Sequence, residues 1–253
     1  MGRQRGMSYD APSTYAALIA PRYAAIGRAL VDAARLRRRD AALELGAGTG
    51  VVTRLAAPRV RTLVATDVSE PMLAHARAAV RGAPGLSFAL VDYTQPRLPF
   101  LSSSFDVVLS GLTFVQDSAP ALREVVRVLK PGGRLALSMW GSSYHEKRVL
   151  NDALTAIGGG RFPRAAPGRV VRRLERLGFE PVERVEHEIS NRFDDVDAYL
   201  AYRRGFGVPA AWTPAYYERF LRAVRTRALD DAAADGSFTL GWVQEVVTAR
   251  LQA

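Results

Sequence analysis

The stretch LELGAGTG, from Leu43 to Gly50, places three glycines at alternate positions directly after an apolar run. A tight turn from a strand into a helix needs only one glycine, so the other two need a second reason. Residues without a Cβ let the backbone take conformations that other residues avoid. They also let a ligand lie against bare backbone, next to the first N–H groups of the following helix. The stretch therefore predicts a ligand-binding loop; the alternative is a turn that binds nothing.

Short apolar runs alternate with helical patterns from about residue 40 onward. Five runs are too short for helices and are expected to be strands: 41–45, 62–66, 86–91, 105–110 and 134–139. Helices are expected near 49–57, 70–81 and 118–129, the second with Ser69 as its N-cap and Pro71 in its first turn. Strands separated by crossover helices predict an α/β fold, a doubly wound and mostly parallel sheet covered on both faces.

The flanking segments complete this sheet. Residues 12–36 are expected to form one or two amphipathic helices, and the Gly- and Pro-rich residues 141–170 are expected to be irregular. Further along, the patterns predict a helix at 169–177, a sixth strand at 179–189, helices at 194–206 and 214–230, and a closing strand at 236–250. The sheet would then have seven strands.

Composition restricts the class of protein. The chain has 253 residues, 48% of them hydrophobic, and a formal charge of +10. All but two of its 35 cationic side chains are arginine, as expected of a GC-rich genome, and they are scattered, so nucleic acid is not the expected partner. The lack of cysteine excludes disulfides and thiol catalysis, and no segment has the roughly 20 apolar residues that span a bilayer. We expect a cytoplasmic protein with no membrane partner.

The glycine loop and two later markers together resemble a known family. A dinucleotide fingerprint would have its third glycine at Val51, whereas this loop reads E-x-G-x-G-x-G. With Thr66-Asp67-Val68-Ser69 after the second strand, Val91-Asp92-Tyr93 after the third and LKPGGRL from Leu129, residues 40–140 resemble the class I S-adenosylmethionine-dependent methyltransferases. The resemblance is to their small-molecule branch with a type 11 domain, which includes the ubiquinone and menaquinone biosynthesis methyltransferases. We interpret LKPGGRL as structural, with Pro131 ending the helix before a turn at Gly132 and Gly133.

The resemblance implies a Rossmann-like methyltransferase fold whose last strand is antiparallel. We expect a single domain over 1–253, divided as follows: an N-terminal helical lid (1–39), a cofactor-binding core (40–140), a completion of the sheet with a variable loop (141–193), a helical cap inserted before the last strand (194–235) and a closing strand (236–253).

The implied cofactor is S-adenosyl-L-methionine, with S-adenosyl-L-homocysteine as its product. The Asp67 carboxylate can accept from both ribose hydroxyls through its two oxygens. The alternative is that Asp67 caps the following helix, a role that Ser69 already fills. Glu44 would be the partner of the cofactor's ammonium group or would hold the loop. By resemblance, Val68 and Met72 flank the adenine, while Asp92 and the backbone of Tyr93 bind its edge. The full expected cofactor set is Glu44, Gly46, Ala47, Gly48, Gly50, Asp67, Val68, Met72, Asp92, Tyr93 and Ser110.

Methyl transfer from a sulfonium needs an aligned nucleophile and, for some acceptors, a base. The candidate base is His145, just past the fifth strand, and the alternative is an exposed loop histidine. The aromatic residues outside the core suit an apolar or ring-containing acceptor. The expected substrate residues are Tyr15, Tyr23, Phe114, Trp140, Tyr144, Tyr202 and Arg203. We expect no metal site.

Three other functions remain open from the sequence. The charge of +10 fits an RNA methyltransferase or nucleic-acid binder. The same loop fits a protein that binds the cofactor without transferring its methyl group. A nicotinamide oxidoreductase is the most distant, because Val51 stands where its third glycine should be.

Overall fold

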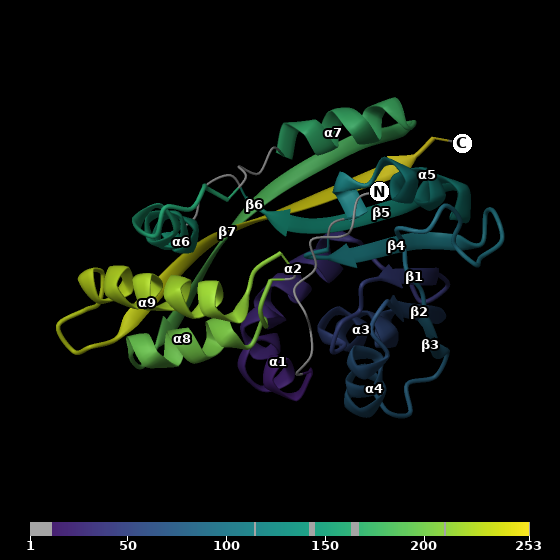
Figure 1. The fold of residues 1–253 in the computed structure, drawn as a ribbon. Helices are drawn as coiled ribbons and strands as arrows, with labels where there is room; N and C mark the ends of the chain where they lie inside the picture. The colour runs from purple at the N-terminus through teal and green to yellow at the C-terminus, as the bar shows by residue number, and fades with distance from the viewer. Residues whose placement is uncertain (1–11, 114, 142–144, 163–166, 210, 253) are drawn as a thin grey trace. The chain divides into compact units, whose positions relative to one another are not determined.

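A computed structural model describes residues 12–113, 115–141, 145–162, 167–209 and 211–252 (Figure 1). These residues form two compact units. The sheet unit contains the described residues within 23–141, 166–187 and 244–253, and the helical unit contains those within 1–22, 142–165 and 188–243. The expected division into lid, core and cap stays a prediction.

One seven-stranded sheet runs in the order β3-β2-β1-β4-β5-β7-β6. Its strands are β1 (Ala41–Leu45), β2 (Thr62–Asp67), β3 (Leu86–Leu90), β4 (Phe105–Gly111), β5 (Leu129–Trp140), β6 (Phe179–Phe193) and β7 (Phe238–Leu251). The first five strands pair in parallel, and β7 pairs with β5 in the antiparallel direction. The predicted fold class is therefore confirmed.

Because the central strands have apolar residues on both faces, helices cover both faces of the sheet. Leu43 and Leu45 point to the face that packs against α5 (Ala119–Val128) and α7 (Pro167–Arg176). Ala42 points to the other face, against α2 (Ala24–Ala33) and α3 (Val51–Ala56). Strand residues alternate between the faces, so Glu44 lies on the α3 side.

Serine side chains begin two of the crossover helices. The predicted cap is confirmed at Ser69, whose hydroxyl accepts from the Met72 N–H at the start of α4 (Glu70–Ala79). Ser118 caps α5 in the same way, accepting from the Ala121 N–H at 3.2 Å. Two short 3₁₀ turns, η2 (Ala57–Arg59) and η3 (Val115–Asp117), complete the connections of the sheet unit.

The LKPGGRL stretch differs in detail from its prediction. The helix ends at Val128, and β5 already begins at Leu129. Between Leu129, opposite Phe105, and Arg134, opposite Val107, the register with β4 shifts. Gly132 has a φ of +72° within this irregular segment. The helix therefore ends before Pro131, and the expected turn at Gly132 and Gly133 is an irregular part of β5.

The helical unit contains α1 (Pro12–Leu18), α6 (His145–Ala156), α8 (Val196–Arg204) and α9 (Pro214–Asp230). The sequence boundary between the two units falls within the 3₁₀ turn η1 (Ala20–Tyr23). Its described core is aromatic, and its buried rings include Phe193, Tyr199, Tyr202, Phe206, Tyr217, Phe220, Phe238 and Trp242. Two boundaries were wrong. Residues 145–156 form a helix where we expected an irregular segment, and β6 continues to Phe193. Among the described helices, none combines the length and apolar character needed to cross a membrane.

Candidate cofactor site

The expected cofactor residues gather at the carboxyl ends of β1, β2, β3 and β4. All of them belong to the sheet unit. In a doubly wound sheet, ligands bind in the crevice beyond these strand ends, where the strand order reverses. Here the reversal falls between β1 and β4, which are neighbours in the sheet although β2 and β3 separate them in the chain.

All three glycines of the loop after β1 have a positive φ, at +78° for Gly46, +55° for Gly48 and +87° for Gly50. Side chains rarely adopt this conformation, which explains the requirement for glycine. The space above each differs. A Cβ on Gly46 would lie 2.3 Å from Thr113 Cγ2, and one on Gly50 would lie 3.1 Å from Ala76 Cβ. A Cβ on Gly48 would meet no heavy atom within 4 Å, so only Gly48 leaves bare backbone open to a ligand among the three.

Asp67, at the end of β2, is held by backbone amides on both sides. Its Oδ2 accepts from the Gly48 N–H at 2.8 Å, and its Oδ1 accepts from the Ser69 N–H at 2.9 Å. Each carboxylate oxygen keeps a second lone pair, and the residue is half-buried. The side chain therefore ties the glycine loop to the start of α4 and can still accept from two further hydroxyl groups.

The loop is also fastened to β2 by its own amides. The N–H groups of Gly46 and Ala47 both donate to the Thr66 carbonyl oxygen at 2.8 Å. Thr49 follows them, and its buried hydroxyl Oγ1 has no hydrogen-bond partner within the described residues. A buried polar atom without a partner is costly, which makes Thr49 Oγ1 a candidate contact for a polar ligand group.

Glu44 is a buried carboxyl group beneath the same loop. Its residue is 1% exposed, and Thr53 Oγ1 on α3 donates to its Oε2 at 2.6 Å. Burial is the main cause that raises the pKa of the Glu44 carboxyl to about 7; the Thr53 hydrogen bond opposes it and the charge of Asp67 adds to it. A cation placed nearby would favour the ionised form.

The remaining predicted cofactor residues differ in how open they are. Val68 is 56% exposed, whereas Met72 is 2% exposed within the base of α4. Both oxygens of Asp92 are engaged, by the Thr94 N–H and hydroxyl and by Gln95 Nε2. Burial alone would raise the pKa of Asp92, but these hydrogen bonds lower it. Val68 therefore offers an apolar face, and Asp92 is fixed as a charged acceptor.

Ser110 is buried at the end of β4, and its Oγ contacts the Leu45 carbonyl oxygen and Thr113 Oγ1. Sequence reasoning missed Thr113, which packs on Gly46, and Thr53, the partner of Glu44. A signal existed for Thr53, since a polar residue on the inward face of the helix after the loop can meet the buried glutamate. No such local signal marks Thr113.

The candidate base His145 lies in the helical unit, as the first residue of α6 rather than in a loop. Its Nδ1 faces the Thr239 carbonyl oxygen at 3.2 Å, and its Nε2 faces Asp231 Oδ2 at 3.0 Å. Both neighbours are acceptors, and a neutral imidazole can donate to only one of them. This geometry links α6 to the end of α9 and the start of β7. The assignment as a base stays a prediction.

The expected substrate residues are divided between the units. Tyr23 and Trp140 lie in the sheet unit, with their rings edge to face at 6.0 Å. Tyr15 and Tyr202 both contact Phe206 in the helical unit. Phe114 and Tyr144 lie outside the described residues.

Arg203, also expected at the substrate, belongs to the interior of the helical unit. Its Nη1 donates to Glu146 Oε1 at 3.1 Å, and its side chain is 12% exposed. Tyr199 Oη donates to the same carboxylate at 3.4 Å. The arginine is therefore engaged by a protein carboxylate, and its role toward an acceptor stays a prediction.

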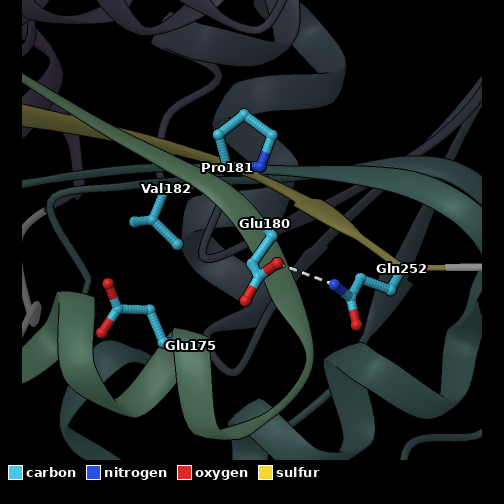
Figure 2. A pocket seen from close by; sticks show the side chains of 5 residues that line it. All are labelled: Glu175, Glu180, Pro181, Val182 and Gln252. Carbon is cyan, nitrogen blue, oxygen red and sulfur yellow. Dashed lines mark hydrogen bonds between the residues drawn. The ribbon is translucent and has the colours of Figure 1, made fainter.

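A shallow hollow lies elsewhere in the sheet unit, lined by Glu175, Glu180, Pro181, Val182 and Gln252 (Figure 2). Gln252 Nε2 donates to Glu180 Oε2 at 2.8 Å across it. Arg250 pairs with Arg134 of β5, and because β7 is antiparallel to β5, Gln252 lies further toward the start of β5. The hollow is therefore at the amino ends of the parallel strands, away from the glycine loop. A second hollow, lined in part by Thr94, Pro120 and Arg123, adjoins the loop that follows Asp92.

The replacement Glu44→Gln tests the buried carboxyl group. Because the pKa of Glu44 is about 7 in the folded chain against 4.5 as its ordinary value, stability is lost as pH rises from about 4.5 through 7. That loss corresponds to about 3 kcal/mol. Glutamine can accept from Thr53 without a charge, so E44Q should remove this part of the pH dependence. Urea unfolding at about pH 5 and about pH 8 measures it.

The matched control is Glu188→Gln, which removes an exposed glutamate of β6 and should leave the pH dependence as it is. If E44Q loses as much unfolding free energy as the wild type over this pH range, Glu44 is not held in its neutral form by burial.

Comparison with known proteins agrees with this geometry. Residues 43–137 match the family described as a methyltransferase domain. The chain is 36% identical over 140 residues to the demethylmenaquinone methyltransferase of Paenarthrobacter aurescens. The matched region covers 51% of this chain and 53% of that protein. It is 33% identical over 130 residues to an uncharacterised protein of Mycobacterium bovis, covering 50% of this chain and 46% of that protein. The chain spans about half the length of the curated relatives it matches.

Among solved structures, the chain is similar to phosphoethanolamine N-methyltransferase 2 of Haemonchus contortus in complex with S-adenosylhomocysteine. The TM-score is 0.59 at 16% identity, over 100% of this chain and 61% of that chain. Similarity at this identity concerns the fold. The resemblance expected from the glycine loop is confirmed, because residues 43–137 of this chain match the methyltransferase domain family.

Proposed function

We propose that this protein is an S-adenosyl-L-methionine-dependent methyltransferase that acts on a small molecule. The observation that carries the proposal is the Asp67 carboxylate, held by the amides of Gly48 and Ser69 beside the one glycine of the loop that is open. In this arrangement, a carboxylate that can accept from a ribose diol lies beside a stretch of uncovered backbone. That suits a nucleoside whose 5′ substituent extends over the loop. The methyltransferase domain match supports the same cofactor.

The residues present fit the parts of the cofactor. Asp67 would accept from the ribose hydroxyls, and exposed Val68 would lie against the adenine, whose amino group would donate to Asp92. The ammonium group would favour the ionised form of Glu44, directly or through water, and the unpaired Thr49 hydroxyl would gain a polar partner. The amino acid part of the ligand would then lie over Gly48.

The cofactor supplies an activated methyl group for in-line displacement, so the chain's tasks are to align the acceptor and exclude water. We place the acceptor at the carboxyl ends of β4 and β5. Tyr23 and Trp140 provide aromatic surface there, and both belong to the sheet unit with the cofactor residues. An apolar or ring-containing acceptor matches such a surface.

A small-molecule acceptor is further supported by the name of the Paenarthrobacter aurescens relative, a demethylmenaquinone methyltransferase. Incubation of the protein with methyl-labelled cofactor and fractionated cell extract tests this proposal. Label should enter the small-molecule fraction. Label in RNA alone would contradict the acceptor class, and cofactor binding without any labelled product would favour a protein that binds without transferring.

Replacement of Asp67 tests the cofactor assignment. Asp67→Ala should weaken binding of S-adenosyl-L-homocysteine by about 1.5 to 3 kcal/mol, the cost of losing hydrogen bonds to a charged group. Calorimetric titration measures this, with thermal unfolding in parallel because the same carboxylate also holds two backbone amides. Asp32→Ala, which removes an exposed aspartate paired with Arg59, is the control. Unchanged affinity in D67A would remove the ribose assignment.

Two glycines form a matched pair for the open loop position. Gly48 and Gly82 both have a positive φ, and a Cβ on either would meet no heavy atom within 4 Å. Replacement of either glycine by alanine should therefore lower the free energy of unfolding by a similar amount, about 1 kcal/mol. Only Gly48→Ala should also reduce the affinity for S-adenosyl-L-homocysteine, by about tenfold or more, because its methyl group would occupy the ligand's place. Equal affinities of G48A and G82A would show that no ligand lies over Gly48.

A further inference from the structure

Leu112 turns the chain directly after β4 in a conformation that leucine rarely adopts. Its φ is +51°, in the left-handed region where a Cβ crowds the backbone. The strained position is held from β5, because the Leu112 N–H donates to both the carbonyl oxygen and Oγ of Ser138, each at 3.0 Å. A strained residue that the neighbouring strand fixes in this way sets the direction of the residue after it.

That next residue, Thr113, lies against the glycine loop. Its Cγ2 is 2.3 Å from the place where a Cβ on Gly46 would be. A side chain at position 46 and the methyl group of Thr113 therefore exclude each other. The absence of a side chain at Gly46 serves this contact, and the segment after β4 packs directly on the segment after β1.

The hydroxyl of Thr113 makes a hydrogen-bond chain with a fixed direction. Ser110 Oγ lies 3.0 Å from the Leu45 carbonyl oxygen, which can only accept, so the single Ser110 proton is donated there. The bond between Ser110 Oγ and Thr113 Oγ1 must then be donated by Thr113. Thr113 Oγ1 in turn accepts from the Val115 N–H at 3.4 Å.

This series of hydrogen bonds thus runs from Val115 through Thr113 and Ser110 to Leu45, the residue that immediately precedes Gly46. One end is the carbonyl of the last residue of β1, next to the glycine loop, and the other is the N–H of the first residue of η3. The Ser110 member is buried, so water does not compete freely for these bonds. Displacement of the segment after β4 relative to the end of β1, from which the glycine loop starts, would break these hydrogen bonds.

We infer that Thr113 is a positioning residue whose hydroxyl couples the cofactor loop, residues 46–50, to the segment after β4, residues 112–115. The inference rests on the proposed function, since it assigns the first loop to the cofactor and the carboxyl end of β4 to the acceptor side. Cofactor binding at the first loop then orders the second, so that the acceptor meets a segment already in place. Reciprocal coupling of this kind follows from linkage.

Hydrogen exchange of backbone amides tests the coupling with the intact chain. In the wild type, S-adenosyl-L-homocysteine should slow exchange of the Gly46–Gly50 amides and, by about tenfold, that of the Val115 amide. Thr113→Val keeps the shape and the methyl group beside Gly46 but removes the hydroxyl. In T113V, the ligand should still slow exchange of the Gly46–Gly50 amides but should no longer slow exchange of the Val115 amide. Thr113→Ser keeps the hydroxyl and should retain both.

Thr226→Val, which removes a threonine hydroxyl bonded within α9, is the control and should behave as the wild type. Protection of Val115 in T113V equal to that in the wild type would overturn the inference while leaving the proposed function intact, and so would loss of that protection in T113S but not in T113V. If the wild type shows no binding of S-adenosyl-L-homocysteine by calorimetry, the proposed function fails and the inference fails with it.

Discussion

The left-handed backbone after β1 is the constraint on which the candidate site depends. Three alternate residues must have a positive φ there, and each serves a different neighbour: Thr113 at Gly46, open space at Gly48 and helix α4 at Gly50. The loop therefore packs closely on the rest of the sheet unit at Gly46 and Gly50 and leaves its backbone uncovered at Gly48. A single substituted glycine would change either the packing of the unit or the surface it offers to a ligand.

Two carboxyl groups with opposite environments lie next to this loop, Glu44 on β1 and Asp67 on β2. Asp67 is fixed by two backbone amides and remains half-buried, whereas Glu44 is buried beside Thr53 with its pKa raised to about 7. Burial of a carboxyl group without a full positive partner is unfavourable for folding. A ligand that brings both a diol and an ammonium group would use the first carboxylate as an acceptor and would stabilise the charge of the second. The electrostatics of the loop therefore suit a nucleoside that carries an amino acid.

The fold was predictable because it depends on short patterns. The β1 strand is bounded by a charged run and a glycine, and the cap at Ser69 follows from its hydroxyl and from Pro71. Helix α6 was missed because the Gly- and Pro-rich residues after it dominated the 141–170 window, although Val149, Leu150 and Ala153 have helical spacing. Thr113 could not be predicted, since its position follows from a left-handed leucine that no local sequence pattern marks. Tyr202 shows the same limit, because an aromatic residue on a helix has the same pattern whether it packs in a core or contacts a ligand.

The most direct measurement is calorimetric titration of the wild-type protein with S-adenosyl-L-homocysteine and, in parallel, with NADH. The account predicts stoichiometric binding of S-adenosyl-L-homocysteine with a dissociation constant on the order of micromolar and no binding of NADH. Binding of NADH alone would contradict the account, because the loop from Gly46 to Gly50 would then be a dinucleotide site despite Val51.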